Sequence, residues 1–260
     1  MESASNATVP SVAKADMFTA DYVDEYVAQL EAGGVIEPST VRDYLKTARR
    51  IRQHFADIKL RDLDPFDIQT WEADLRRGGL SASVVGKAHR LLKSACKRAV
   101  ELDILDRNPL DKVKPPRCEK KRPNALDRDG RAKVMELLSV MKPTSFVTAA
   151  TISPYTGIRR GELCALRWRD IDLDNSMTYV QAAIGVGNNG TFEKATKTSS
   201  STRSIPISQH LAQALKRRMA LMQSERMKCG MPATEPEFAA LYVLGSPDGQ
   251  YLSPNVLTRD

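Results

Sequence analysis

The sequence predicts two domains, an all-α domain of four helices followed by an α+β domain that is mainly helical. Its 260 residues are enough for two domains of ordinary size. A proline-rich, basic stretch at residues 108–123 divides the chain, and strand-like segments occur only after it. We therefore expect an N-terminal tail at 1–17, a helical domain at 18–107, a linker at 108–123 and a second domain at 124–260.

Turn and capping residues delimit the helices of the first domain. Asp64 is a good N-cap with Pro65 at the first helical position, and glycine pairs follow two of the helices. The predicted helices are residues 19–32, residues 39 or 40 to 57, Pro65 to the Gly78-Gly79 pair, and residues 81–102.

Two of these helices have a basic stripe beside an apolar one. On a helical wheel, the cations of the second and fourth helices lie apart from the apolar positions, while acidic residues collect on the first and third helices. The stripes comprise Arg42, Lys46, Arg49, Arg50, Lys87, Arg90, Lys93, Lys97 and Arg98. An inert surface mixes both charge signs, so we interpret the stripes as contacts to a DNA backbone. The alternative is an ordinary solvated face.

The stretch NPLDKVKPPRCEKKRP, residues 108–123, has the composition of an interdomain linker. Its four prolines prevent a helix from continuing through it. A solvated surface loop is the alternative interpretation.

The second domain mixes helical and strand-like segments. Asp127 is the expected N-cap of a helix that ends near Ser139. Further helices are predicted at 144–154, 158–167 and 208–228. Strands are predicted at 177–183, 204–207 and 241–244.

A charged motif stands within the predicted helix 158–167. On a wheel, Arg159 shares a face with Leu163 and Leu166, and an arginine between core leucines would need an anionic partner. Glu162, three positions on, could be that partner in a purely structural pair. Alternatively, the Arg159 guanidinium is held by a rigid helix to bind a phosphate.

The full motif, T-G-x-R-x-x-E-L-x-x-L-x-W-x-D-I-D from Thr156 to Asp172, resembles the first arginine motif of the tyrosine recombinases, the phage-integrase family. The resemblance extends over nearly the whole chain. It implies a SAM-like core-binding domain, then the linker, then a partial catalytic domain of the tyrosine-recombinase type. Residues 193–207 resemble the β-hairpin of the family that contains its catalytic lysine. The resemblance places that lysine at Lys197, with Lys194 as the competing candidate.

The family resemblance implies site-specific DNA recombination, or integration of a phage or other mobile element. A tyrosine attacks the scissile phosphate and forms a 3′-phosphotyrosyl link, without a metal or another cofactor. Arg159 would bind the nonbridging oxygens, Lys197 would protonate the leaving oxygen, and Glu162 would hold Arg159. The implied partner is double-stranded DNA, with a homo-oligomer on DNA in the full-length form, and no small-molecule substrate.

Two elements of the family are not found in these residues, the H-x-x-R motif and a nucleophilic tyrosine after it. His54 and His89 lie in the first domain, and His210 has no arginine three positions on. We therefore expect a shortened integrase that is inactive alone, whether the shortening is natural or artificial. A noncatalytic DNA-binding protein that occupies recombination sites is the alternative, and a helical interaction module is a third possibility.

Composition excludes several other classes of protein. Hydrophobic residues make up 42% of the chain and charged residues 27%, as in folded proteins, and the net charge of +7 suits a polyanionic partner. No apolar run reaches the ~18 residues of a membrane span, and the first residues do not have the pattern of a secretory leader, so we expect none. The four cysteines and three histidines do not have zinc-site spacings. We expect a cytoplasmic protein that binds neither membrane nor metal.

Overall fold

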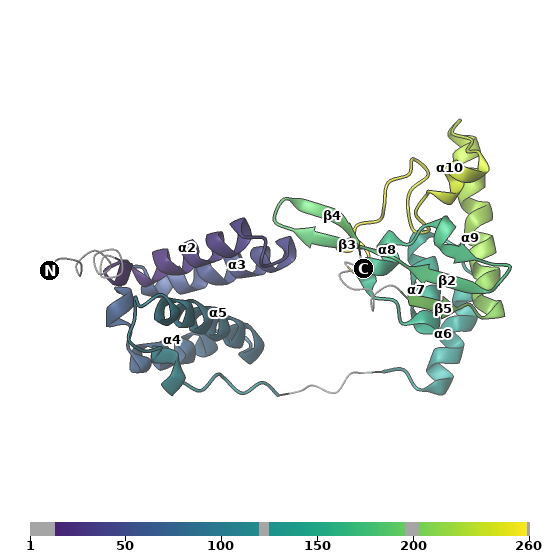
Figure 1. Cartoon of the computed structure of the whole chain (residues 1–260). Helices are drawn as coiled ribbons and strands as arrows, with labels where there is room; N and C mark the ends of the chain where they lie inside the picture. The colour runs from purple at the N-terminus through teal and green to yellow at the C-terminus, as the bar shows by residue number, and fades with distance from the viewer. Residues whose placement is uncertain (1–13, 120–124, 196–202, 259–260) are drawn as a thin grey trace. The chain divides into compact units, whose positions relative to one another are not determined.

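A computed structural model describes residues 14–119, 125–195 and 203–258 of the chain. The chain forms two compact units, Met1–Arg122 and Pro123–Asp260. Figure 1 shows that the first unit contains helices alone, whereas the second combines helices with short strands. Each unit has its own hydrophobic core, and each is described separately.

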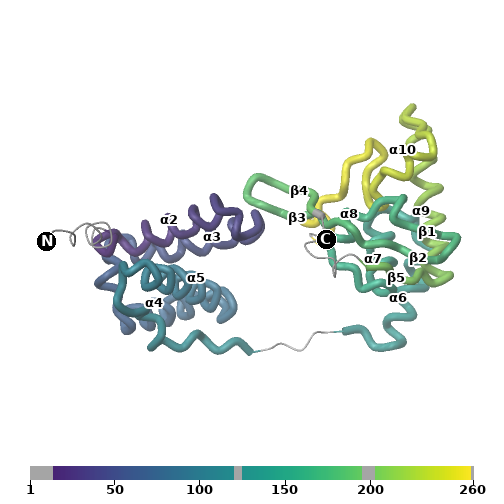
Figure 2. Tube along the Cα trace, in the orientation of Figure 1, coloured from purple at the N-terminus to yellow at the C-terminus, as the bar shows by residue number. Residues whose placement is uncertain are grey.

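The first unit includes four α-helices and two short 3-10 helices. Figure 2 shows the Cα trace of this unit. All four predicted helices are confirmed to within two residues at each end. The elements are α2 (Thr19–Ala32), α3 (Pro38–Phe55), η1 (Leu60–Asp62), α4 (Pro65–Arg77), α5 (Ala82–Glu101) and η2 (Pro109–Lys112). Asp64 caps α4 by accepting a hydrogen bond from the backbone N–H of Phe66 at 2.7 Å, which leaves one fewer unsatisfied donor at the helix start.

The core of the first unit forms where α2, α3 and α4 pack around α5. Phe55 of α3 and Trp71 of α4 meet edge to face at 5.0 Å, and both are buried. The side of α5 that faces them is almost wholly apolar and includes Leu91 and Leu92. Its cationic residues are therefore confined to the opposite side of the helix, as the wheel predicts.

The first residues of the expected linker belong to the first unit. Leu110 is completely buried and Val113 is nearly so. The Asn108 side chain accepts a hydrogen bond from Leu110 N and donates one to Lys93 O, both at 3.0 Å. The prediction of a linker from residue 108 was therefore wrong for 108–113. Proline count alone missed this because proline suits the first position of a short helix, here η2.

The second unit has five α-helices, one short 3-10 helix and five strands in the part of the chain that the structure describes. They are α6 (Arg128–Val140), α7 (Ser145–Thr156), α8 (Arg160–Ala165), η3 (Trp168–Asp170), β1 (Ile171–Asp172), β2 (Met177–Val180), β3 (Ala182–Gly187), β4 (Gly190–Ala195), β5 (Arg203–Pro206), α9 (Gln209–Lys228) and α10 (Glu235–Ala239). The strands form two antiparallel sheets, one in the order β1-β2-β5 and the other a β3-β4 hairpin.

Two strand predictions in the second unit need correction. The predicted strand 177–183 divides into β2 and β3, which belong to different sheets. The predicted strand 241–244 makes only an isolated bridge, between Tyr242 and Arg167. Backbone hydrogen bonds from Trp168 N to Leu241 O and from Val243 N to Leu166 O flank the bridge. These backbone hydrogen bonds hold residues 241–244 so that their apolar side chains pack in the core without joining a sheet.

The core of the second unit centres on α9. Leu211, Leu215 and Met222 of this helix are buried against Trp168 and Val243. Arg218 is buried on the same helix, and its guanidinium donates to the carbonyl oxygens of Val243 at 3.0 Å and Gly245 at 2.8 Å. These bonds tie the segment after α10 to α9.

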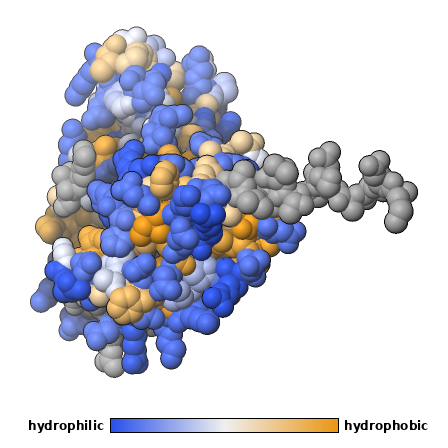
Figure 3. Space-filling model, turned by 90° about the vertical axis from the view of Figure 1, so that its left-hand side faces the viewer, coloured by the Kyte–Doolittle hydropathy of each residue, from blue (hydrophilic) through white to orange (hydrophobic). Residues whose placement is uncertain are grey.

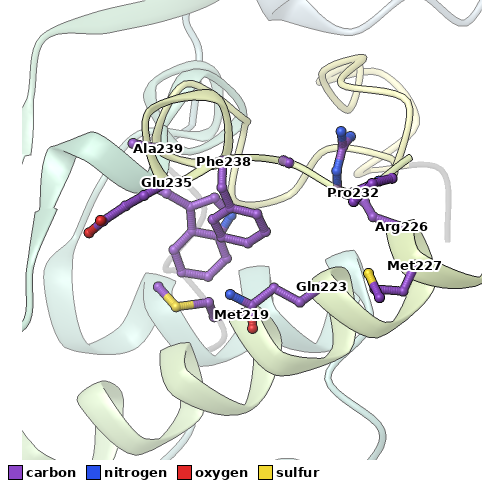
Figure 4. Close-up of a pocket in the computed structure, with 10 residues that line it drawn as sticks. Met219, Gln223, Arg226, Met227, Pro232, Glu235, Phe238 and Ala239 are labelled. Carbon is purple, nitrogen blue, oxygen red and sulfur yellow. The ribbon is translucent and has the colours of Figure 1, made fainter. Parts of the chain in front are cut away.

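No helix of the described residues is long and apolar enough to cross a membrane. The face shown in Figure 3 is mainly hydrophilic, with apolar side chains gathered in a smaller area near its middle. Figure 4 shows a pocket of about 590 Å³ beside α9 and α10, lined by Met219, Gln223, Arg226, Phe238 and their neighbours. Among the described residues, none of those predicted for the site lines this pocket.

Candidate active site

Arg159 lies just before helix α8 and points to solvent. Helix α7 ends at Gly157, which has a left-handed conformation with φ of 62°. The chain is then extended at Arg159, and α8 begins only at Arg160. The wheel prediction that Arg159 shares a helical face with Leu163 and Leu166 was therefore wrong. Its side chain is 76% exposed, so the guanidinium needs no buried anion.

Glu162 lies below Arg159 and binds it twice. Its side chain is only 7% exposed. Its Oε2 accepts a hydrogen bond from the Arg159 backbone N–H, and its Oε1 accepts one from Arg159 Nη1, both at 3.0 Å. The first bond satisfies a backbone donor at the start of α8, and the second limits the positions open to the Arg159 side chain.

A second arginine, Arg203 of β5, binds the same carboxylate. Its Nη2 lies 2.7 Å from Glu162 Oε2 and its Nη1 lies 3.2 Å from Glu162 Oε1. This is a two-pronged ion pair, the geometry in which guanidinium and carboxylate groups match best. The sequence did not predict this contact, because the two partners are 41 positions apart in the chain.

The two arginines keep Glu162 ionised. Burial alone raises the pKa of this carboxyl, but the hydrogen bonds from Arg203 and from the backbone and side chain of Arg159 outweigh burial, and its pKa lies below the ordinary value. Two guanidinium groups facing one carboxylate leave a surplus of one positive charge. Because Arg159 is the exposed member, this surplus is presented to solvent there.

Helix α8 and strand β3 approach each other at Gly161. A Cβ at this position would lie 2.7 Å from the carbonyl oxygen of Ile184. Ile184 is buried against Cys164 and Ala165 on the other turns of α8. The hairpin is therefore packed on the same short helix that positions Glu162.

A polar cluster fastens strand β4 to the rest of the unit. Arg167 Nη2 donates to Glu193 Oε2 at 2.9 Å and to the Tyr242 hydroxyl at 2.6 Å, and that hydroxyl donates to Glu193 at 2.7 Å. The Arg167 guanidinium also lies 4.2 Å from the centre of the Tyr242 ring. Nearby, the hydroxyls of Tyr251 and Thr191 are 2.7 Å apart. The hairpin is thus held along β4 by residues from distant parts of the chain.

Lys197, the lysine favoured by the resemblance, lies outside the described residues. The competing Lys194 is on β4, paired in register with Ala183 of β3. The choice between the two lysines stays a prediction.

The cations of α3 and α5 meet along one side of the first unit. Arg42, Lys87 and Arg90 line a groove of about 380 Å³ between the two helices, together with Asp43. Lys46, Arg49 and Arg90 have no carboxylate within 4.0 Å among the described residues, and all three are exposed. These three are the cations of the stripes with the most accessible charge.

Four of the other basic residues of the stripes are partly neutralised by carboxylates. Lys87 lies 3.6 Å from Asp43, Lys93 lies 2.9 Å from Asp111, and Glu101 lies 3.8 Å from Lys97 and 3.2 Å from Arg98. The expectation that acidic residues collect on the other helices was therefore incomplete, since Asp43 and Glu101 belong to α3 and α5 themselves. Exposed pairs of this kind contribute little to stability and separate easily when a stronger anion approaches.

Comparison with known proteins places both units in one family. The model of the phage integrase SAM-like domain matches residues 19–115, and the model of the phage integrase family matches residues 132–230. A tyrosine recombinase XerC-like protein of Caldanaerobacter subterraneus subsp. tengcongensis is 25% identical over 201 residues, 73% of this chain and 50% of that protein. A putative prophage phiRv2 integrase of Mycobacterium tuberculosis is 27% identical over 164 residues, 62% of this chain and 42% of that protein.

Solved structures share the fold. The Tn1549 transposon integrase in complex with transposon right end DNA superposes with a TM-score of 0.72 at 21% identity, covering 91% of this chain and 74% of that one. A lambda integrase dimer bound to a core site gives a TM-score of 0.70 at 17% identity, covering 99% and 65%. The chain spans about half the length of the curated relatives named above. With a SAM-like first domain and the first arginine motif in the second, it belongs to the phage integrase family of tyrosine recombinases.

Proposed function

We propose that this chain acts in site-specific DNA recombination or integration of a phage or other mobile element, as the part of an integrase that binds DNA and activates the scissile phosphate. The main support is the arginine cluster. Glu162 is buried and shared by two arginines, and it leaves the guanidinium of Arg159 exposed beside the hairpin. A phosphate bound there would meet a fixed positive charge, which is what a crowded phosphorane transition state requires.

In this proposal each site residue has one role. Arg159 binds the nonbridging oxygens of the phosphate, and Glu162 holds Arg159 in place. Lys197 protonates the oxygen that leaves. The bond energy of the cleaved strand is kept in a phosphotyrosyl link, so no metal or nucleotide cofactor enters the reaction.

The first unit holds the double-stranded DNA. The accessible cations of α3 and α5 contact backbone phosphates, and the paired ones join as their carboxylate partners are displaced. Several structures of similar fold contain DNA, including a lambda integrase tetramer bound to a Holliday junction. We propose that this protein, too, assembles as a homo-oligomer on DNA in its full-length form. The DNA substrate and the four unpaired cysteines of the described residues suit the cytoplasm.

The alternative of a noncatalytic DNA-binding protein is less well supported. The match at residues 132–230 lies in the second unit and includes the first arginine motif. A protein that only occupied DNA would have no need of an exposed guanidinium fixed by a buried carboxylate.

Charge reversal on α3 and α5 tests the DNA-binding part of the proposal. The variant Arg49→Glu, Lys87→Glu, Arg90→Glu is compared with wild type by fluorescence anisotropy on duplex DNA across a salt series. We expect weaker binding and a flatter dependence of log Kd on log salt, by about 0.9 for each phosphate that the variant no longer neutralises.

The matched control reverses Arg61, Arg76 and Arg77, which lie on η1 and α4 of the same unit. It changes the net charge equally and should reduce affinity much less. Equal losses in the two variants, with both folded, would contradict a DNA surface on α3 and α5.

A further inference from the structure

We propose that Arg203 is a positioning residue that occupies the Glu162 carboxylate and so leaves the Arg159 guanidinium available for a phosphate. The inference rests on the proposed function and adds a division of labour between the two arginines. Arg203 holds the carboxylate, whereas Arg159 faces the ligand.

The hydrogen-bond geometry distinguishes the two arginines. Arg203 uses two nitrogens, Nη1 and Nη2, one for each oxygen of Glu162. Arg159 uses one side-chain nitrogen, Nη1, together with its backbone N–H. The Arg159 side chain is 76% exposed and that of Arg203 is 30% exposed. The ion pair of Arg203 is therefore the more enclosed and the more complete of the two.

The bonding capacity of Glu162 explains why both arginines are needed. A carboxylate has about four lone-pair sites for hydrogen bonds. In Glu162 four donors use them: Arg159 N, Arg159 Nη1, Arg203 Nη1 and Arg203 Nη2. A second side-chain nitrogen of Arg159 would find no acceptor site there. That part of the Arg159 guanidinium is thus left to bind another anion.

Removing Arg203 would change which donors bind the Glu162 carboxylate. Two acceptor sites of a buried carboxylate would be left without donors, which is costly for an ionised group. Arg159, three residues away, already contacts this carboxylate through a flexible side chain and can replace them. Arg159 would then turn toward Glu162 as a two-pronged partner and withdraw from the phosphate.

Arg203 does not have the same freedom to move as Arg159, because its backbone is part of a sheet. Arg203 is paired in register with Val180 of β2, whose side chain is buried in the core of the unit. Arg159 has no such strand and lies in a short extended stretch between α7 and α8. The fold thus fixes the arginine that holds Glu162 and leaves the phosphate-binding arginine adjustable.

The test combines substitutions at all three residues with binding to a duplex of about 30 base pairs at low salt. Arg159→Ala and Arg203→Met should each weaken binding roughly 10-fold, the value of one charge-assisted contact. The double variant should bind no more than about threefold more weakly than Arg159→Ala, because both changes remove the same interaction with the phosphate. Arg169→Met, which removes an exposed cation of η3, is the charge-matched control and should change affinity by less than about threefold.

Rescue separates positioning from a general structural role. In Arg203→Met, the further change Glu162→Gln removes the anion that captures Arg159 and keeps an amide oxygen for the Arg159 backbone N–H. We expect this double variant to recover most of the affinity of wild type. Arg203→Lys keeps the charge without the fork and should bind with intermediate affinity, and it is the variant to use if Arg203→Met does not fold.

Different results overturn different claims. If the losses from Arg159→Ala and Arg203→Met multiply to roughly 100-fold, or if Glu162→Gln gives no rescue, Arg203 acts independently and this inference is wrong while the proposed function stands. If Arg159→Ala binds DNA as wild type does in every background, Arg159 makes no phosphate contact, and the inference fails together with that part of the proposed function.

Discussion

A methyl group at Gly161 would lie 2.7 Å from the carbonyl oxygen of Ile184, so α8 and β3 are as close as two backbones can be at that point. The close approach matters because α8 holds Glu162 and β3 begins the hairpin. A side chain there would have to push backbone away from backbone, since the nearest atom is not part of a flexible side chain.

We predict that Gly161→Ala destabilises the second unit by about 1–3 kcal/mol, the usual cost of overpacking. The measurement is chemical unfolding of the purified chain, followed by a signal from Trp168 for the second unit and by one from Trp71 for the first. Gly86→Ala on α5 is the contrasting change, because the nearest atom there is at the ordinary contact distance of 3.5 Å. That change should leave stability equal or raise it by up to about 1 kcal/mol, as alanine favours a helix. If Gly161→Ala caused no loss of stability, the close approach at Gly161 would be contradicted.

The buried guanidinium of Arg218 gives a second stability prediction. It donates to the backbone oxygens of Val243 and Gly245, and more weakly to Pro143 O at 3.4 Å. Burial lowers its pKa from the ordinary value. Arg218→Met would fill similar space and leave these carbonyl groups without donors, at a cost of about 2–4 kcal/mol.

The control for Arg218 is its neighbour Lys216, which is exposed on the same helix. Lys216→Met should change the free energy of unfolding by less than about 0.5 kcal/mol. A small effect at both positions would show that water replaces the Arg218 donors readily.

Helix ends were the part of the fold most open to prediction from sequence. Asp64, Ser81, Asp127 and Ser208 each accept a hydrogen bond from the first turn of the helix that follows. Such caps are local and depend on residues two or three positions apart, so sequence reveals them. Helices α4 and α5 of the first unit were found in this way, whereas α2 and α3 begin without a side-chain cap.

Features that depend on distant contacts were not predictable in the same way. The left-handed Gly157 ends α7, and the extended residues after it move Arg159 off the helix that the wheel assumed. The pairing of Glu162 with Arg203 depends on how β5 joins the sheet. Residues 241–244 looked like a strand because they are apolar, yet backbone bonds to Leu166 and Trp168 place them in the core without a sheet.

Proteolysis provides a third prediction, on the last residues of the first unit, which follow η2. Residues 114–119 have no regular secondary structure, and most of them are exposed. Trypsin cuts poorly before proline, which protects the bonds after Lys114 and Arg122, so the first cuts should follow Arg117, Lys120 or Lys121. Mass spectrometry of a brief digest should find two stable fragments that meet there. Early cleavage after Lys112 would contradict the packing of η2, because Leu110 and Val113 are buried on either side of it.

The alkaline titration of Tyr242 provides the last prediction. Burial, together with the hydrogen bond to Glu193, raises the pKa of its hydroxyl to about 12. An unfolded tyrosine has a pKa of about 10, so between these values the unfolded state loses a proton that the folded state keeps. The stabilisation is fully present below a pH of about 10 and is lost as the pH rises toward 12.

The variant Tyr242→Phe should therefore show a smaller loss of stability than wild type above a pH of about 10, measured by denaturant unfolding at a series of pH values. In absorbance titrations it should also lack one late-ionising phenol, while that of Tyr22 in the first unit, whose pKa burial also raises to about 12, persists. If wild type and variant lose stability in parallel over this range, the contact of Tyr242 with Glu193 does not hold the proton.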